Sequence, residues 1–165
     1  MAHKYACMAL VNNQATIIAG YETATVETLA VSGWTPEPSH PSGLSNNRYN
    51  SHSCVSIDDG IITTGGNNGT TNLKTVYFFK NEEWKLVGEL SNTFSQGSMI
   101  AVQDAFLVYG GSGQSIMVER VEWDGEKIIS TRNLTDHGGN CIRPILFKTQ
   151  FDTCSDFCSN NFCYN

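Results

Sequence analysis

The sequence repeats at intervals of 45 and 46 residues, and this repeat limits the possible folds more than any other feature. Three sets of positions keep this spacing, with one member in each repeat: Gly20, Gly66 and Gly111; Met8, Cys54 and Met99; and Asn12, Asp58 and Gln103. Units of this size are supersecondary structures that cannot bury their own apolar faces, so neighbouring units must stack on each other. We therefore expect a series of similar units rather than one unrepeated core.

Each unit begins with two short apolar runs that are separated by a polar turn. The runs cover residues 6–11 and 15–19, then 53–57 and 61–64, and finally 99–102 and 105–109. Short apolar or β-branched runs between Asn, Asp and Gly turns are typical of strands that are buried on both faces. A third strand is predicted after each glycine, at residues 25–29, 75–79 and 118–122. Helices are not favoured, because the runs are short and interrupted every few residues.

Small residues and tryptophans complete the pattern of each unit. The second apolar run ends in Ala19-Gly20, in Gly65-Gly66 and in Gly110-Gly111. Trp34 and Trp84 each follow a valine of the third strand by eight residues, whereas Trp123 stands before an Asp-Gly turn in the third unit. An apolar strand, a tight turn, a strand that ends in Gly-Gly, an alternating strand and a downstream tryptophan resemble the kelch repeat. The resemblance covers residues 3–134.

The kelch resemblance implies an all-β fold, a β-propeller with one four-stranded antiparallel blade per repeat around a central axis. The tryptophans are expected to fill the space between blades. A closed propeller needs about four to eight blades, and 165 residues supply only three units and part of a fourth. We therefore expect an incomplete propeller, which a second copy of the chain or further blades outside this sequence would close.

The repeat predicts the following division of the chain. The first blade covers about 3–36, a proline-containing linker 35–50, the second blade 51–90, the third blade 94–134, and a partial fourth blade 137–149. Within the fourth unit, Pro144 would stand inside the first strand, where it would remove a hydrogen bond of the sheet. Residues 150–165 form a Cys-rich tail with few residues that could build a core.

Composition excludes several classes of protein. Apolar residues make up 40% of the chain and charged residues 16%, a balance that argues against intrinsic disorder. The net charge of −6 without a cluster of Lys and Arg argues against a nucleic-acid partner. No apolar stretch is long enough to span a membrane. The first residues do not resemble a signal peptide, which favours the cytoplasm, whereas the Cys-rich tail and the sequons at Asn68 and Asn133 allow an extracellular origin.

The cysteines and histidines show no local metal-binding spacing, so we predict no metal site, no cofactor and no catalytic residue. Cys7 and Cys54 lie in predicted strands, where they are expected to be small buried hydrophobic residues. The other four cysteines are Cys141, Cys154, Cys158 and Cys163. They form either a disulfide-linked tail or an unstructured end with free thiols.

His52 stands at the entrance to a predicted strand, where we expect it to hydrogen-bond to backbone.

The resemblance implies a protein-protein interaction module that binds a partner through loops at one end of the propeller, without chemistry. In the family, the contacts come from the residue after the glycine pair and from the segment that leads into the first strand. The matching positions are Tyr21, Asn67 and Ser112 for the first group, and Tyr49, Ser51, Phe94 and Gln96 for the second. Exposed Tyr and Phe side chains would be good anchors, although these residues could also only line the loops.

Two features of the family are missing from the sequence. The arginines that often stand at the strand entrances are absent, which argues against an acidic peptide as the ligand. Some kelch proteins are enzymes, including copper oxidases that use Tyr, His and a Tyr-Cys crosslink, but no motif here matches those ligands. Because the family also includes enzymes, the alternative function is a fragment of an extracellular kelch protein with oxidase-like or carbohydrate-binding activity.

Overall fold

The computed structural model describes residues 3–112, 117–134 and 141–146. Within them the chain is all-β, as predicted, with twelve strands in three four-stranded antiparallel sheets. The first sheet contains β1 (Cys7–Val11), β2 (Gln14–Gly20), β3 (Thr23–Ala30) and β4 (Gly33–Glu37). The second contains β5 (Asn50–Ile57), β6 (Gly60–Asn67), β7 (Leu73–Lys80) and β8 (Glu83–Phe94). The third contains β9 (Gly97–Val102), β10 (Ala105–Gly110), β11 (Met117–Trp123) and β12 (Ile128–Asn133).

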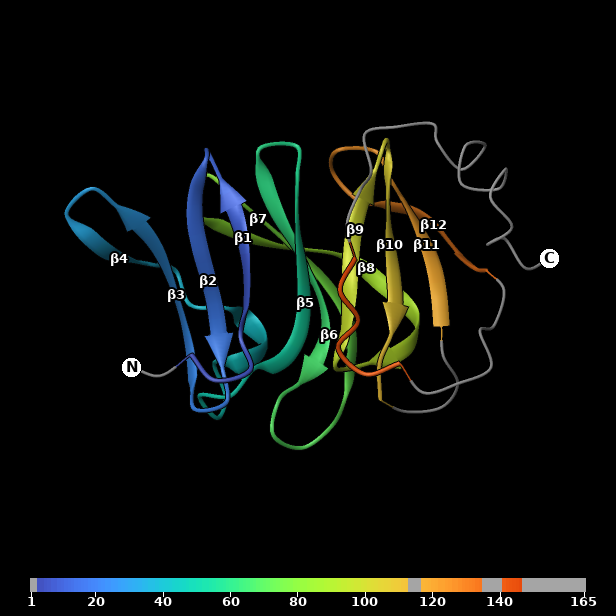
Figure 1. Cartoon of the computed structure of the whole chain (residues 1–165), viewed down its shortest axis with the longest axis horizontal. Helices are drawn as coiled ribbons and strands as arrows, with labels where there is room; N and C mark the ends of the chain where they lie inside the picture. Colours follow the sequence, from blue (N-terminus) through green and yellow to red (C-terminus); the bar gives the residue numbers. More distant parts are fainter. Residues whose placement is uncertain (1–2, 113–116, 135–140, 147–165) are drawn as a thin grey trace, which may run out of the picture.

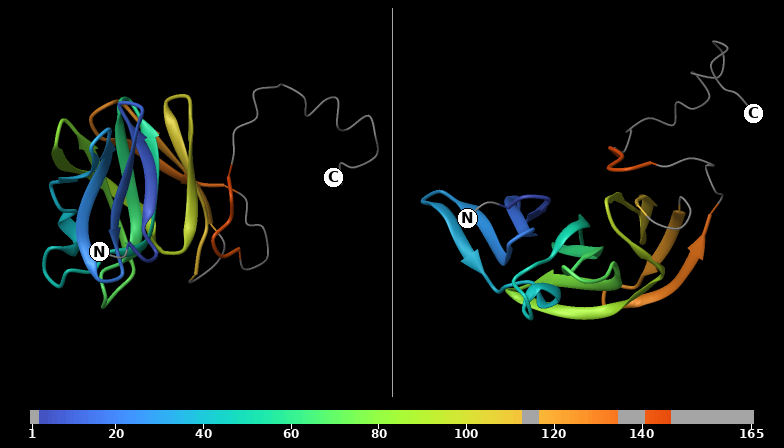
Figure 2. Two further views of the ribbon diagram at one scale, coloured as in Figure 1. Left: turned by 60° about the vertical axis from the view of Figure 1, so that its left-hand side comes forward. Right: turned by 90° about the horizontal axis from the view of Figure 1, so that it is seen from below.

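The three sheets stand side by side in an arc (Figures 1 and 2). In the right-hand view of Figure 2, the first strand of each sheet lies on the concave side of the arc and the fourth strand lies on the convex side. A short 3-10 helix, η1 (Pro41–Gly43), lies in the connection between the first two sheets. No helix in the described part of the chain is long and apolar enough to cross a membrane.

The turns between first and second strands form as the polar residues in the sequence predict. Asn12 and Asn13 connect β1 to β2, and both have positive φ angles, of 49° and 61°. Asp58 and Asp59 have nearly the same pair of angles, 49° and 58°, between β5 and β6. Two consecutive residues with positive φ define the type I′ turn, which matches the twist of the flanking strands and is favoured by Asn and Asp.

Two apolar clusters hold the sheets together, and the second sheet contributes to both. Ile61 is buried against the first sheet and Ile62 against the third, because neighbouring residues of a strand point to opposite faces. The cluster between the first two sheets contains Ile18, Ala19, Val26, Tyr49, Ile61 and Phe79. The larger cluster between the second and third sheets includes Ile62, Val76, Phe78, Phe106, Val108, Val121 and Trp123. Burial on both faces explains why β6 carries two adjacent isoleucines and no charged residue.

Two of the three tryptophans fill the space between sheets, and one does not. Trp84 packs against the cluster between the first two sheets, and its Nε1 donates a hydrogen bond to the Pro38 carbonyl at 2.9 Å. Trp123 lies between the second and third sheets, where its Nε1 donates to the Asp58 carboxylate at 2.6 Å. Trp34 remains 46% exposed, because no described element covers its side of the first sheet.

A series of backbone hydrogen bonds joins equivalent residues of successive units on the concave side. The members of this inner belt are Tyr5, Ser51, Gln96 and Arg143, and all four have positive φ angles between 54° and 61°. The Ser51 N–H donates to the Tyr5 carbonyl (2.8 Å), that of Gln96 donates to Ser51 (2.8 Å), and that of Arg143 donates to Gln96 (2.7 Å). The repeat therefore continues beyond the third sheet.

The described part of the predicted fourth blade contains no strand. Residues 141–146 join the inner belt but form no ladder with β9 or β10. Pro144 has no N–H to donate to a ladder, as the sequence indicated. The remainder of the predicted fourth blade and the tail at 150–165 lie outside the described residues.

The first prediction concerns the glycine pair of the second unit. Gly65 has a φ angle of 65°, and a Cβ atom there would lie 2.4 Å from the ring and from the carbonyl oxygen of Phe94. We expect Gly65→Ala to lower the free energy of unfolding by about 2–4 kcal/mol, because it combines backbone strain with overpacking. Denaturant titration of the purified variant measures this loss.

Gly125 is the matched control for this substitution. It also has a positive φ angle, of 95°, but a Cβ atom there would meet nothing within 4 Å. Gly125→Ala should therefore cost only about 1 kcal/mol of backbone strain. Equal losses for the two variants would contradict the close packing of Phe94 on Gly65.

Candidate functional site

The two groups of predicted contact residues do lie at one end of the molecule, where the second strands end. The N–H of Tyr21, which follows β2, donates to the carbonyl of Lys4 at 2.8 Å. The N–H of Ser112, which follows β10, donates to the carbonyl of Ser95 at 2.8 Å. In the second unit Asn67 pairs with Asn50 in the same way. The residue after the glycine pair is thus bonded to the segment that leads into the first strand of its own unit.

Two of the predicted anchors are not available for a partner. Tyr49 is 0% exposed and Phe94 is 3% exposed, so the expectation of exposed aromatic residues at these positions is wrong. Tyr49 belongs to the cluster between the first two sheets. The Phe94 ring lies against the backbone of Gly65 and Gly97, where a Cβ atom would collide with it. These aromatic rings fill space that the glycines leave open.

The other five predicted residues keep some exposure, and two of them belong to the inner belt. Ser51 and Gln96 are half-buried members of the belt, and Asn67 and Ser112 are half-buried at the ends of β6 and β10. The Ser112 hydroxyl shares a hydrogen bond with the Ser95 hydroxyl at 2.9 Å. Tyr21 is the exposed aromatic residue of the predicted set.

Tyr21 is part of a cation-aromatic cluster that the sequence patterns did not indicate. Its members are Lys4, Tyr5, Tyr21, Arg48 and Arg143. The two tyrosine rings meet edge to face, with centroids 6.4 Å apart. The Arg48 guanidinium lies 4.7 Å from the Tyr21 centroid, and that of Arg143 lies 4.8 Å from the Tyr5 centroid. Lys4 lies within 6 Å of both rings. Contacts of this kind favour a fixed arrangement of cations over aromatic faces.

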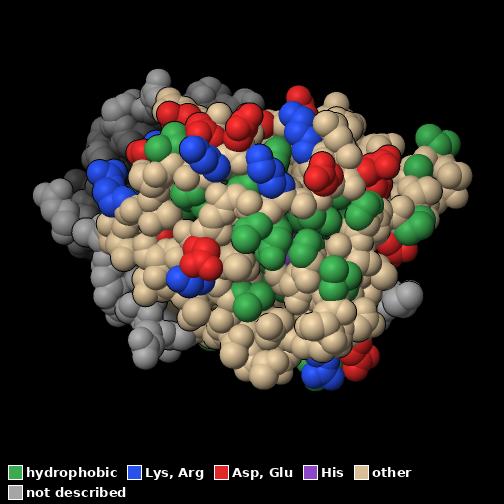
Figure 3. Space-filling view, turned by 180° about the vertical axis from the view of Figure 1, so that it is seen from behind, with side chains coloured by type: hydrophobic (Ala, Val, Ile, Leu, Met, Phe, Trp, Pro, Cys, Tyr) green, Lys and Arg blue, Asp and Glu red, His purple; other side chains and the backbone are tan. Residues whose placement is uncertain are grey.

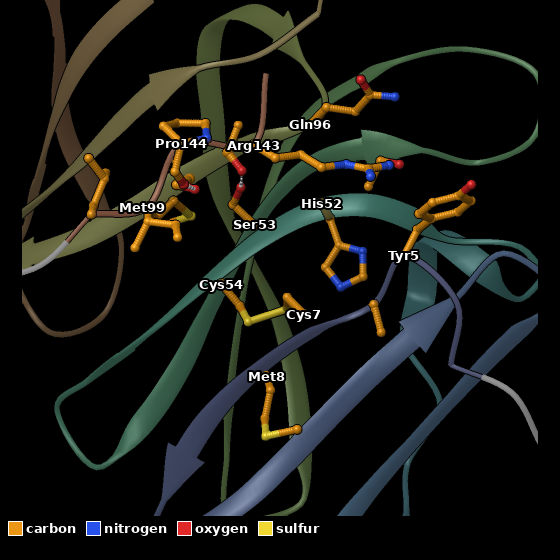
Figure 4. Close-up of a pocket in the computed structure, with 16 residues that line it drawn as sticks. Tyr5, Cys7, Met8, His52, Ser53, Cys54, Gln96, Met99, Arg143 and Pro144 are labelled. Atoms are coloured by element: carbon orange, nitrogen blue, oxygen red, sulfur yellow. Dashed lines mark hydrogen bonds between the residues drawn. A yellow bond between two sulfur atoms is a disulfide. The ribbon is translucent and has the colours of Figure 1, made fainter. Parts of the chain in front are cut away.

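A cavity of about 370 Å³ opens beside this cluster, between the first strands of the three sheets (Figure 4). The inner belt lines its rim with the side chains of Tyr5, Ser51, Gln96 and Arg143. Met8, Met99, Cys7 and Cys54 line it further along the strands. In Figure 4 the Arg143 side chain extends toward Tyr5, across His52. The described lining contains this one Lys or Arg and no Asp or Glu, so the cavity favours anionic or neutral groups.

Cys7 and Cys54 form a disulfide bond, which corrects their prediction as buried free cysteines. Their Cα atoms are 5.9 Å apart, and the bond joins β1 to β5 across the first two sheets. The sequence pattern did not reveal this pair, because Cys54 is in register with Met8 rather than with Cys7. Cys141 is a free, half-buried cysteine. Cys154, Cys158 and Cys163 lie outside the described residues, so both interpretations of the tail remain open.

His52, Tyr49 and His40 form a buried stack that begins at the cavity. The rings of His52 and Tyr49 are 4.1 Å apart, and those of Tyr49 and His40 are 4.0 Å apart. The His40 Nδ1 accepts a hydrogen bond from the Ser42 N–H, so its Nε2 carries the proton that it shares with the Thr63 hydroxyl at 2.9 Å. The two ring nitrogens of His52 make no hydrogen bond of standard geometry, although the backbone of Ile18 lies nearby.

Burial keeps both histidines of the stack neutral. It lowers the pKa of His52 to about 3, and it lowers the pKa of His40 well below its usual value, with a smaller contribution from His52. The pKa of the Tyr49 hydroxyl is raised, also by burial. Within the described ranges, no group of three or more His, Cys, Asp and Glu side chains could hold a metal ion. The stack is therefore best described as part of the packing behind the cavity.

Comparison with known proteins gives a likeness of fold. No protein-family model matches the chain, and no curated protein matches it at a significant level. A solved structure described as "Structure of YjhT" is similar, with a TM-score of 0.63 and 16% sequence identity. The match covers 78% of this chain and 45% of that structure, so the chain spans less than half of its length. At this identity the likeness supports the all-β arrangement and no particular activity.

The second prediction concerns the disulfide bond. Cys7 and Cys54 are separated by 47 residues, and closing a loop of this length removes conformational entropy from the unfolded chain. Replacing both by serine should lower the free energy of unfolding by about 2–4 kcal/mol. Peptide mapping under non-reducing conditions should recover the Cys7-Cys54 peptide pair, and detection of both thiols in free form would contradict the bond.

The third prediction concerns the pH dependence of stability. The pKa of His52 is lower in the folded state than in the unfolded chain, so below about pH 6.5 the unfolded state binds more protons. The stability that neutral His52 provides is present above that pH and is lost as the pH falls toward 3. His52→Asn should reduce the slope of the unfolding free energy by about 1.4 kcal/mol per pH unit between pH 6 and 4. Denaturant titrations at several pH values measure both slopes, and identical slopes would contradict the burial of a neutral His52.

Proposed function

We propose that the three sheets are blades of an incomplete kelch-like β-propeller, and that the chain is a non-enzymatic module that binds a protein partner. The repeat of 45 and 46 residues, the four consecutive antiparallel strands in each sheet and the arc in Figure 2 support this proposal. The first strands line the concave side, where the axis of a propeller would pass. The inner belt then corresponds to the rim of the central opening.

The observation that carries the binding function is the cation-aromatic cluster at the mouth of the cavity. Tyr5 and Tyr21 are 42% and 37% exposed, although each packs against cationic side chains. Tyr and Arg are the residues that most often dominate the energy of protein interfaces, because they combine a large contact area with few rotatable bonds or with a rigid fork of donors. Mutual packing holds these side chains in place before a partner arrives, which lowers the entropy that binding would cost.

The charges of this end favour a partner segment that carries Asp or Glu beside an aromatic or aliphatic residue. Lys4, Arg48 and Arg143 contribute three positive charges to a chain whose net charge is −6. In the view from behind, most Asp and Glu side chains lie along the opposite, hairpin-turn end of the molecule (Figure 3). The predicted strand-entrance positions hold no arginine, but Arg48 and Arg143 lie directly beside them and supply the charge.

The alternative of an oxidase-like or carbohydrate-binding fragment remains a prediction. The chain has four histidines, which are His3, His40, His52 and His137. His3 pairs with Glu27 and His40 is buried in the stack, so His52 is the one of these three side chains that lines the cavity. His137 lies outside the described residues. No specific observation favours the alternative over the binding module.

The fourth prediction tests the binding surface. Selection of a displayed library of random twelve-residue peptides on the immobilised chain should enrich sequences with Asp or Glu next to an aromatic or aliphatic residue. Tyr21→Ala and Arg143→Glu should each weaken an enriched peptide at least tenfold, about 1.4 kcal/mol, as expected of interface anchors. Fluorescence anisotropy of the labelled peptide measures the affinity.

Lys85→Glu is the matched control for the charge change. Lys85 is exposed on β8, away from the cluster, so the same reversal of charge should leave the affinity unchanged at 0.15 M salt. Equal effects of Lys85→Glu and Arg143→Glu would mean that only net charge matters. Selection that yields no acidic preference would contradict the proposed surface.

A further inference from the structure

The face of the first sheet that points away from the second sheet is apolar and uncovered. Cys7, Ala9 and Val11 of β1 pack toward the second sheet, so the alternate residues Met8 and Leu10 point the other way. Strand pairing adds Ala15 and Ile17 of β2 to this open face, because they lie opposite Leu10 and Met8. It also adds Leu29 of β3 and Trp34 of β4, which lie opposite each other. Met8 and Leu10 are 58% and 53% exposed, and Leu29 and Trp34 are also exposed.

The equivalent faces of the second and third sheets can be identified from the register of the repeat, and both are covered. Cys54, Ile61 and Trp84 occupy in the second sheet the positions of Met8, Ala15 and Trp34 in the first, and they pack against the first sheet. In the third sheet Met99 and Phe106 occupy the first two of these positions, and they are buried against the second sheet. In both cases this face is covered by the preceding sheet. The open face of the first sheet is therefore one half of an inter-sheet interface that the chain already forms twice.

The opposite end of the arc carries the other half of that interface. Ile100 and Leu107 pair across β9 and β10 on the side of the third sheet that faces away from the second. Their equivalents in the second sheet, Val55 and Ile62, pack toward the third sheet. In the described residues the inner belt runs from the Tyr5 carbonyl in the first unit to the Arg143 N–H beside the third sheet.

The charged side chain on the open face does not oppose burial. Glu27 pairs with Ile17 and Pro36 across the sheet, and its carboxylate contacts the Nε2 of His3 at 2.5 Å. A paired and hydrogen-bonded charge tolerates partial burial far better than an isolated one. The remaining side chains of the face gain free energy when they leave water, at about 25 cal/mol per Å² of apolar area. From behind, apolar side chains are visible at the end of the molecule that the first sheet forms (Figure 3).

We propose that a second copy of this chain covers the open face, so that the first sheet of each copy packs against the third-sheet end of the other and two copies close a ring. One chain matches 45% of the length of the similar solved structure, so two copies together supply about the length of that fold. Two identical head-to-tail interfaces related by one two-fold axis form a closed assembly. The proposal does not rest on the proposed binding function, because the cation-aromatic cluster lies at the end of the sheets and not on this face.

The test is the mass of the full chain in solution, measured by light scattering between 1 and 100 μM under non-reducing conditions. We expect a species of two chains, twice 18.1 kDa. Leu29→Lys, which places a charge on the open face, should shift the population to a monomer with an unchanged circular dichroism spectrum. Val31→Lys is the matched control, because Val31 is fully exposed in the turn between β3 and β4 and lies beyond the face. Tyr21→Ala should also leave the mass unchanged.

A second measurement does not depend on how the variants fold. Trp34 should be protected from quenching by acrylamide in the dimer and exposed at low concentration, with Trp34→Phe used to assign its share of the fluorescence. A monomer at 100 μM would overturn the proposal, as expected if further sheets of a longer polypeptide or a different protein cover the face. Open series of three or more chains would overturn it as well, because the rotation would then not close after two copies.

Discussion

Burial of the second sheet on both of its faces is the interaction on which the other features of this chain depend. Ile61 and Ile62 are both fully buried, one in each of the two apolar clusters. Since one sheet takes part in both clusters, the spacing and order of all three sheets follow from it. This packing places β1, β5 and β9 next to one another on the concave side. The cavity and the Cys7-Cys54 bond lie between these three strands, and the inner belt links the segments at which the strands begin.

The inner belt links the stacked sheets and fixes which side chains lie at the rim of the cavity. Each belt residue has a left-handed backbone, so the chain turns sharply at Tyr5 and Gln96, just before β1 and β9, and at Ser51, at the start of β5. The turn lets an N–H donate to the equivalent residue of the preceding unit, and it directs the belt side chains to the rim of the cavity. At this rim the Arg143 guanidinium lies over the Tyr5 ring, and Tyr5 also contacts Lys4 and Tyr21. The candidate site is therefore a direct product of the repeat.

The periodicity was sufficient to predict the strands but not the direction of side chains at the left-handed positions. The runs at 53–57 and 61–64 became β5 and β6, because apolar burial and Asn or Asp turns are encoded locally. Side-chain alternation, however, holds only while the backbone stays extended. Ser51 and Gln96 interrupt it, so Tyr49 and Phe94 turn into the core although they resemble exposed loop anchors.

Sequence patterns also did not predict which residues of different units contact each other. The repeat aligns Cys54 with Met8, and only the lateral offset between neighbouring first strands brings Cys54 to Cys7 instead. The same applies to Arg48 and Arg143, whose charges reach Tyr21 and Tyr5 from other units of the chain. Such pairs depend on how sheets are placed in space. A period along the sequence specifies what each unit looks like, but it does not specify this placement.

Partner binding by the cation-aromatic cluster and closure of a ring by two copies would be coupled, because the cluster lies at the rim of the concave side. The cavity and the cluster lie on the concave side, which in a two-fold ring would face the same feature of the other copy across the axis. Two anionic segments could then bind near one opening, or one partner with two such segments could engage both copies. A flexible link between two bound segments raises apparent affinity by an effective concentration that can reach the millimolar range. The Leu29→Lys monomer would lose this gain and keep the affinity of a single site, so closure of the ring would strengthen binding without contributing any contact to it.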